Sequence, residues 1–137
     1  MMRTWIVNGL CGALILSAAL PATAATPEFP KALTGELIAI EREKCQQAIA
    51  YGQAFYRFAD VTGDGQADLV LDYKDANCYI KPDLFCPNGG NAPCFTKVYQ
   101  RQGGGWKKIF EGTPRSISMA KTAKGSQMVI DGRPLGQ

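Results

Sequence analysis

Oxygen donors recur at alternate positions of one short stretch, residues 60–68. They are the side chains of Asp60, Thr62, Asp64 and Asp68, with the backbone carbonyl of Gln66 completing the series. Counted from Asp60 as position 1, the side chains occupy positions 1, 3, 5 and 9, and the carbonyl position 7. Calcium-binding loops place oxygens in this alternating order, and Gly65 stands at position 6, where a sharp turn disfavours a Cβ. The spacing therefore predicts a calcium site.

The second half of the pattern departs from a high-affinity calcium loop. Position 12 is Leu71 instead of a bidentate Glu, and Thr62 is a neutral ligand. With three carboxylates we expect weak binding, with a dissociation constant on the order of 10⁻⁴ to 10⁻³ M. The alternative is a plain hairpin turn without metal, because Asp and Gly favour turns on their own account. We prefer calcium because a bare turn does not require this spacing of oxygens.

Strands are needed to position the loop. Residues 54–59 and 68–73 flank it, and both are short, rich in aromatic and aliphatic side chains and bounded by turn residues. Alternation along the second strand puts its apolar residues on one face: Leu69, Leu71 and Tyr73. Asp72 then shares the other face with Asp68, either as a further oxygen near the metal or as a solvent-facing residue.

The segment DVTGDGQADLV resembles the D-x-[DNT]-G-D-G-x-x-D loops of FG-GAP and VCBS repeats and, more distantly, the loops of dockerins and EF-hands. In FG-GAP-type proteins such loops bind calcium between the strands of a blade. The resemblance implies the same role here for Asp60, Thr62, Asp64, Gln66 and Asp68. One copy of the loop cannot build a propeller, which needs about four to eight blades.

The wider order of features resembles a group of small secreted proteobacterial proteins. A Cys-bearing helix precedes the calcium loop, the loop ends in LVLDY, and an FC…GG…C segment and a GGGW turn follow. This resemblance implies an exported protein without indicating a particular activity.

The first residues have the pattern of a secretory signal peptide at 1–24. Arg3 precedes a largely apolar run over 5–20, and Ala22-Thr23-Ala24 offers a cleavage site. The alternative is an uncleaved anchor, but the run is shorter than the roughly 20 residues of a membrane span. We expect a periplasmic or secreted protein without a transmembrane segment after cleavage. Its parts would be a linker at 25–33, one α+β domain at 34–132 and a flexible tail at 133–137.

Four cysteines follow the signal peptide, and an even number in an exported chain predicts two disulfides. Cys86 and Cys94 flank a short loop rich in Pro, Gly and Asn, so we pair them with each other. This leaves Cys45 paired with Cys78. The rival interpretation, a zinc site with four cysteines, lacks a C-x-x-C pair and is disfavoured in an oxidising compartment.

Several classes of function are excluded by composition. The chain contains no His, which rules out Ser–His–Asp and Cys–His catalysis and imidazole metal sites. The three glycines at 103–105 lack the Lys-Ser/Thr of a phosphate loop and are typical of a turn. The net charge is only +3, and nucleic acid is not expected as the partner of an exported protein. We predict a protein that is not an enzyme.

Outside the loop, the pattern predicts a helix followed by strands. The helix covers residues 34–50, capped by Thr34 and stopped near Gly52, with Glu36 on its solvated face. Further strands are expected at 94–101, 106–111, 115–122 and 127–131. The predicted fold is α+β, with an N-terminal helix packed on a small antiparallel β-meander of about four to six strands.

The leading hypothesis is an exported, monomeric calcium-binding protein that binds an unknown envelope protein or anionic polymer. The loop 74–93, with Tyr79, Leu84 and Phe85, is the candidate recognition surface. Basic residues could form a second surface or only keep strand edges soluble. They are Lys97, Arg101, Lys107, Lys108, Arg115, Lys121, Lys124 and Arg133.

Two rival hypotheses use other chemistry. A carboxylate-based hydrolase acting on an envelope glycan would use an acid–base pair among residues 60–72. An inhibitor of a secreted hydrolase would insert the loop between Cys78 and Cys94. If calcium is structural, loss of Asp64 and Asp68 should lower the melting temperature only when calcium is present.

Overall fold

The computed structural model describes residues 27–137, so the predicted signal peptide at 1–24 lies outside the described residues. Helical structure runs from Lys31 to Cys45 and contains a 3₁₀ turn, α1 (Thr34–Ile40) and a π-helical turn. The strands are β1 (Ala50–Tyr51), β2 (Tyr56–Ala59), β3 (Asp68–Asp72), β4 (Ala76–Asn77), β5 (Thr96–Gln102), β6 (Gly105–Gly112), β7 (Ile117–Lys121), β8 (Ser126–Ile130) and β9 (Arg133–Pro134). No helix in this described part is long and apolar enough to cross a membrane.

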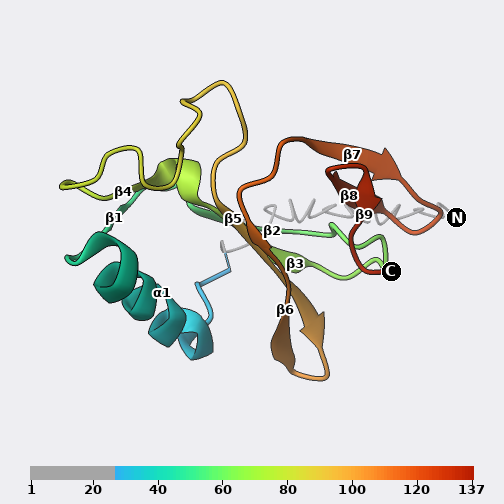
Figure 1. The fold of residues 1–137 in the computed structure, drawn as a ribbon. Helices are drawn as coiled ribbons and strands as arrows, with labels where there is room; N and C mark the ends of the chain where they lie inside the picture. The colour runs from blue at the N-terminus through green and yellow to red at the C-terminus, as the bar shows by residue number, and fades with distance from the viewer. Residues whose placement is uncertain (1–26) are drawn as a thin grey trace, which may run out of the picture.

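A four-stranded antiparallel sheet, in the order β2-β3-β5-β6, forms the central layer of the molecule (Figure 1). Successive residues of β3 point to opposite faces of this sheet. Leu69 and Leu71 pack in one hydrophobic cluster with Ile40 of α1. Val70 packs in a second cluster with Met128 of the three-stranded sheet β7-β8-β9. The central sheet is therefore covered on one face by the helical segment and on the other by the C-terminal sheet.

The sequence predicts a single meander, and the structure differs from this prediction. The strands divide into three sheets, the third being the two-stranded pair β1-β4. The chain leaves the central sheet after β6, where Pro114 follows and has no N–H group to continue a ladder. The described residues contain one short helical segment, antiparallel sheets and two disulfides, and the fold is mostly β.

The helix predicted at residues 34–50 begins earlier and ends sooner. A 3₁₀ turn already covers Lys31–Leu33, so Thr34 lies inside the helical segment and does not cap it. The segment ends at Cys45, after which Gln46 adopts a left-handed conformation (φ 64°) that terminates helices. The chain then turns back and β1 pairs with β4.

The predicted flexible tail at 133–137 begins with β9 (Arg133–Pro134), which belongs to the C-terminal sheet. Asp131 (φ 49°) and Gly132 (φ 78°) form a turn in which both residues have positive φ, and β9 returns to pair with β8. Leu135 is 8% exposed, and its N–H donates to the carbonyl of Met128 (2.9 Å). Burial of Leu135 holds the end of the chain in place.

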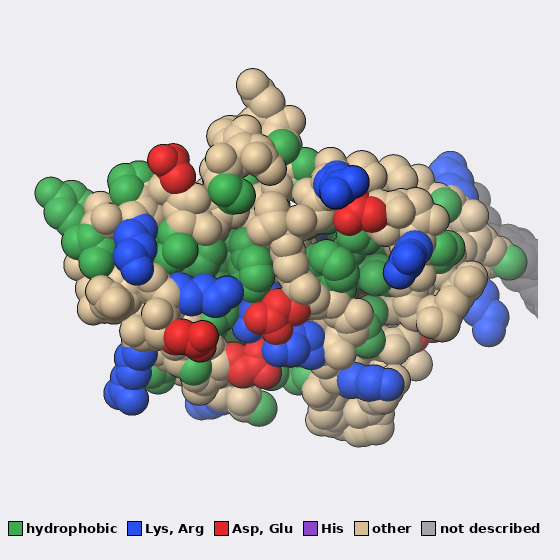
Figure 2. Space-filling view, in the orientation of Figure 1, with side chains coloured by type: hydrophobic (Ala, Val, Ile, Leu, Met, Phe, Trp, Pro, Cys, Tyr) green, Lys and Arg blue, Asp and Glu red, His purple; other side chains and the backbone are tan. Residues whose placement is uncertain are grey.

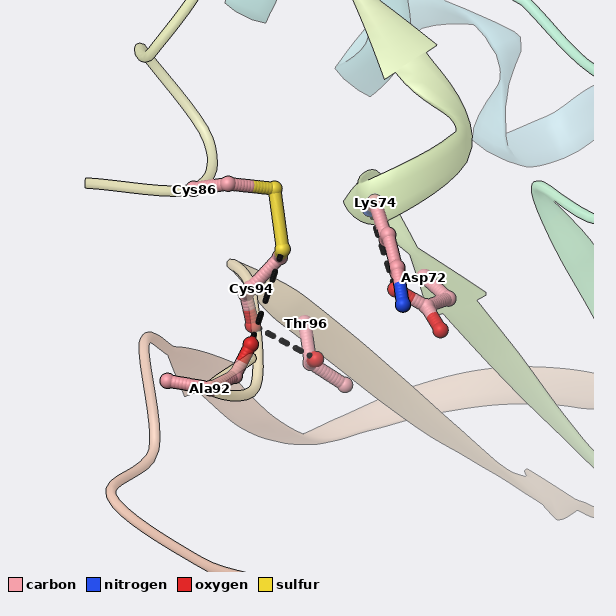
Figure 3. Close-up of a disulfide and its surroundings, with 6 residues drawn as sticks. All are labelled: Asp72, Lys74, Cys86, Ala92, Cys94 and Thr96. Carbon is pink, nitrogen blue, oxygen red and sulfur yellow. Dashed lines mark hydrogen bonds between the residues drawn. A yellow bond between two sulfur atoms is a disulfide. The ribbon is translucent and has the colours of Figure 1, made fainter. Parts of the chain in front are cut away.

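Both predicted disulfides are formed. Cys45–Cys78 joins the end of the helical segment to the chain after β4, with Cα atoms 5.7 Å apart. Cys86–Cys94 closes the loop before β5, with Cα atoms 4.5 Å apart. Figure 3 shows the second bridge beside Thr96, whose hydroxyl donates to the carbonyl of Cys94 (3.0 Å). Because these four cysteines are bonded in pairs, the zinc interpretation is wrong.

Candidate metal centre

The predicted calcium loop joins β2 to β3, and the register that pairs Ala59 with Asp68 brings its two ends together. Asp60, Asp64 and Asp68 each offer one carboxylate oxygen, and these three atoms lie within 4.8 Å of one another. Calcium binds oxygens at about 2.3–2.6 Å, so ligands on opposite sides of one ion lie roughly 5 Å apart. The three carboxylates are therefore close enough to share one ion.

Asp68 is the buried member of this cluster, with 0% of its surface exposed. Its Oδ2 atom accepts hydrogen bonds from the N–H groups of Val61 (3.0 Å) and Thr62 (3.1 Å) and from the Thr62 hydroxyl (3.0 Å). Its Oδ1 atom is buried and has no hydrogen-bond partner among the described residues. An unsatisfied buried carboxylate oxygen is costly. A cation shared with Asp60 and Asp64 would satisfy it.

The other two carboxylates hold the loop in its turn. Asp60 accepts hydrogen bonds from the N–H groups of Gly63 (2.8 Å) and Gly65 (3.0 Å). Both glycines have positive φ, at 77° and 83°, which explains their place in the pattern. Asp64 accepts a hydrogen bond from the N–H of Gln66 (2.8 Å). Each carboxylate oxygen can accept in more than one direction, so these bonds leave capacity for a metal.

Thr62 and Gln66 occupy different places in the loop. Thr62 is 7% exposed, and its hydroxyl donates a hydrogen bond to Asp68. The Thr62 side chain therefore orients that carboxylate. Gln66 is exposed and its N–H is used by Asp64. Their roles as metal ligands stay predictions.

Asp72 does not join the metal cluster found in residues 27–137. It shares a strand face with Asp68, as the alternation predicted, but lies four positions further along β3. Its Oδ1 atom accepts the N–H of Lys74 (3.0 Å) and caps the 3₁₀ turn that follows (Figure 3). Asp72 therefore caps this turn and is not one of the three clustered carboxylates.

The predicted basic surface is smaller than the sequence suggested. The Nζ atoms of Lys97 and Lys108 lie 3.4 and 3.9 Å from Oε2 of Glu36, and Lys97 is only 3% exposed. The Arg101 guanidinium stacks over the Trp106 ring, 4.5 Å from its centre. Figure 2 shows acidic and basic side chains interleaved near the centre of one face. The exposed cations of this set that take part in none of these contacts are Lys107, Arg115, Lys121, Lys124 and Arg133.

The loop between Cys78 and Cys94 has some side chains in the core and others on the surface. Phe85 is 3% exposed and packs against Tyr73 and Phe95, with ring centres 4.8 and 6.1 Å away. Tyr79 and Ile80 are 84% and 51% exposed. Of the predicted recognition residues, Tyr79 is therefore on the surface, whereas Phe85 anchors the loop.

Glu36, predicted to lie on a solvated helix face, instead ties the helical segment to the central sheet. Its Oε2 atom accepts a hydrogen bond from the Tyr99 hydroxyl and pairs with Lys97. Glu111 lies 3.8 Å from the same lysine. One sequence signal could have revealed this network. Lys97 stands midway between Phe95 and Tyr99 at inward-facing strand positions, where a lysine requires a charged partner.

The network predicts a specific dependence of stability on pH. Burial alone would raise the pKa of Glu36, but the Tyr99 hydrogen bond and the two lysine charges outweigh it and hold that pKa below its ordinary value. A hydrogen bond from Lys108 lowers the pKa of Glu111 despite partial burial. A carboxyl with a depressed folded pKa stabilises fully above its unfolded pKa of about 4.3, and this contribution disappears as the pH falls through the folded pKa.

Because the Glu36 side chain is 39% exposed and solvent screens its ion pairs, we expect Glu36→Gln to destabilise the protein by about 0.5–1 kcal/mol at pH 7 and to flatten the loss of stability below about pH 4. Urea unfolding between pH 7 and pH 3 measures both effects. Glu43→Gln is the matched control, because Glu43 is exposed and belongs to the same helical segment. Identical acid dependence in the wild type and Glu36→Gln would contradict the role given to Glu36.

Comparison with models of known protein families, with curated proteins and with solved structures finds no match to this chain.

Proposed function

We propose that this chain is an exported protein whose fold is stabilised by one calcium ion, and that it acts by binding a partner. The carboxylates of Asp60, Asp64 and Asp68 would hold the ion, with the Thr62 oxygen and the Gln66 carbonyl as further ligands. The observation that carries the proposal is the unpartnered, buried Oδ1 atom of Asp68 within a cluster of three carboxylates. Two disulfides support export, because they persist in oxidising compartments.

Binding is favoured over hydrolysis by the arrangement of the carboxylates. A glycan hydrolase needs one carboxyl with a raised pKa to act as the general acid. In the hydrolase hypothesis this acid–base pair lies among residues 60–72 and must flank a bound glycan. Asp60, Asp64 and Asp68 converge on one another, which suits an ion. The inhibitor hypothesis stays a prediction, and binding assays of the purified protein against secreted hydrolases would test it.

Calcium titration of the oxidised protein is expected to show one site with a dissociation constant on the order of 10⁻⁴ to 10⁻³ M. Binding to the folded state alone then adds about 1.4–2.7 kcal/mol to the free energy of unfolding at about 10 mM calcium. Isothermal calorimetry measures the first quantity. Urea unfolding with calcium or with chelator measures the second.

Asp64→Asn is the informative variant for this titration, because Asp64 is exposed and its loss leaves the buried Asp68 contacts in place. It should weaken calcium binding without changing stability in chelator. Asp83→Asn is the matched control, since Asp83 is exposed and lies outside the cluster. If the wild type shows no saturable binding at millimolar calcium, the loop is a turn and the proposed site is wrong.

A further inference from the structure

The turn between β7 and β8 lies directly against the predicted calcium loop. The Thr122 hydroxyl donates to the carbonyl of Gly63 (3.5 Å). Gly125 approaches Asp60 so closely that an added Cβ would collide with its Oδ2 atom. Two hairpins that are far apart in the sequence therefore meet at a carboxylate of the metal cluster.

Further contacts of the C-terminal sheet also end on the loop. The N–H of Met128 donates to the carbonyl of Val61 (2.7 Å), and Gln127 forms an isolated bridge with Thr62. The N–H groups of Val61 and Thr62 are in turn held by Asp68. The backbone of Val61 and Thr62 therefore contacts the C-terminal sheet and also holds the buried carboxylate of Asp68.

The charge of the loop makes this attachment sensitive to a cation. Three carboxylates within 4.8 Å repel one another unless a cation compensates them. The turn also brings the Lys124 carbonyl close to the loop, 3.8 Å from the position of a Cβ on Gly65. A bound ion would relieve the repulsion and favour the conformation of the loop that receives the turn.

Docking of the C-terminal sheet completes the second hydrophobic cluster. The C-terminal segment contributes Met128 and Ile130 of β8 and Leu135 after β9, and the other side contributes Val61, Val70 and Val98. All are less than 9% exposed in the docked arrangement. Release of the sheet would uncover apolar surface on both sides, and an ion that binds the docked arrangement more tightly would favour docking.

We infer that the calcium site is a clasp: the ion bound by Asp60, Asp64 and Asp68 holds the β7-β8-β9 sheet on the central sheet, and calcium removal loosens it. This inference rests on the proposed calcium site and adds a regulated element to it. Coupling between ion and sheet is reciprocal, so a change that disturbs docking of the turn must weaken calcium binding by the same factor.

Amide hydrogen exchange of the full oxidised protein tests the clasp. With about 10 mM calcium, amides of β7-β8-β9 should exchange about ten- to a hundredfold more slowly than in chelator, together with those of residues 60–68. Magnesium at the same concentration serves as the ion control, because it demands a tighter octahedral site.

Two variants probe the contact from the side of the turn. Gly125→Ala forces a Cβ against Asp60 and should weaken calcium binding by at least about fivefold. Gly90→Ala is the matched control, because a Cβ there meets no atom within 4 Å. Thr122→Val keeps the side-chain shape while removing the hydrogen bond to the Gly63 carbonyl and the one accepted from the Gly125 N–H, and should reduce the calcium-dependent protection of β7-β8-β9. It keeps the test valid if Gly125→Ala fails to fold.

The outcomes separate the clasp from the calcium site itself. If calcium binds and protects residues 60–68 but leaves exchange in β7-β8-β9 unchanged, the clasp is wrong while the proposed site stands. Unchanged calcium affinity in folded Gly125→Ala and Thr122→Val would also overturn the clasp. Absence of calcium binding in the wild type would remove both.

Discussion

Replacing Asp68 with alanine is expected to lower the free energy of unfolding by about 3–5 kcal/mol, in chelator as well as in calcium. The Asp68 carboxylate accepts hydrogen bonds from Val61 and Thr62 at the fully buried start of β3. Alanine leaves these donors without an acceptor and removes a carboxylate of the proposed calcium site at the same time. Equilibrium urea unfolding in both conditions measures the loss.

The comparison with Asp64→Ala makes this prediction specific. Asp64 is exposed, so its removal should reduce stability only when calcium is present, whereas Asp83→Ala should have no effect in either condition. The expectation from sequence, that Asp64 and Asp68 respond to calcium in the same way, is revised because the Asp68 hydrogen bonds to the loop backbone are buried, whereas the Asp64 bond from Gln66 is exposed to solvent. A loss below about 1 kcal/mol for Asp68→Ala in chelator would contradict this assignment.

Removal of the Cys45–Cys78 disulfide is expected to cost about 4 kcal/mol, more than any other single cross-link in the described chain. The bridge spans 33 residues, for which the loss of loop entropy in the unfolded chain gives about 4 kcal/mol. Both sulfurs belong to residues no more than 1% exposed, so their replacement also disturbs the core. Urea unfolding of the Cys45→Ala, Cys78→Ala double variant measures the effect.

The second disulfide provides the control. Cys86–Cys94 spans 8 residues, and the same reasoning gives a cost of about 2.5 kcal/mol for its double alanine variant. Both double variants should keep their calcium affinity while folded, since neither disulfide contains a residue of the metal cluster. A larger loss from the short bridge than from the long one would show that native contacts, and not loop entropy, decide the order.

Local spacing was sufficient to predict the loop, its flanking strands and the paired cysteines. Oxygens at alternate positions around Gly65, short apolar segments on either side and an even set of cysteines are all visible within a few residues of sequence. The pairing of β5 with β6 could also be predicted, because adjacent antiparallel strands need only a short turn. Gly103 (φ 54°) and Gly104 (φ 89°) provide that turn.

Contacts between distant segments were decided only by the tertiary structure. The pairing of Glu36 with Lys97 spans 61 residues, and the contact of Gly63 with Thr122 spans 59. Neither follows from periodicity, because periodicity shows which face of an element is apolar without showing what covers it. The spacing of oxygen donors in the loop is therefore visible in the sequence alone. The tertiary structure decided that Asp68 is buried with one oxygen unpartnered and that a second hairpin closes over the loop, because both depend on which surfaces pack together.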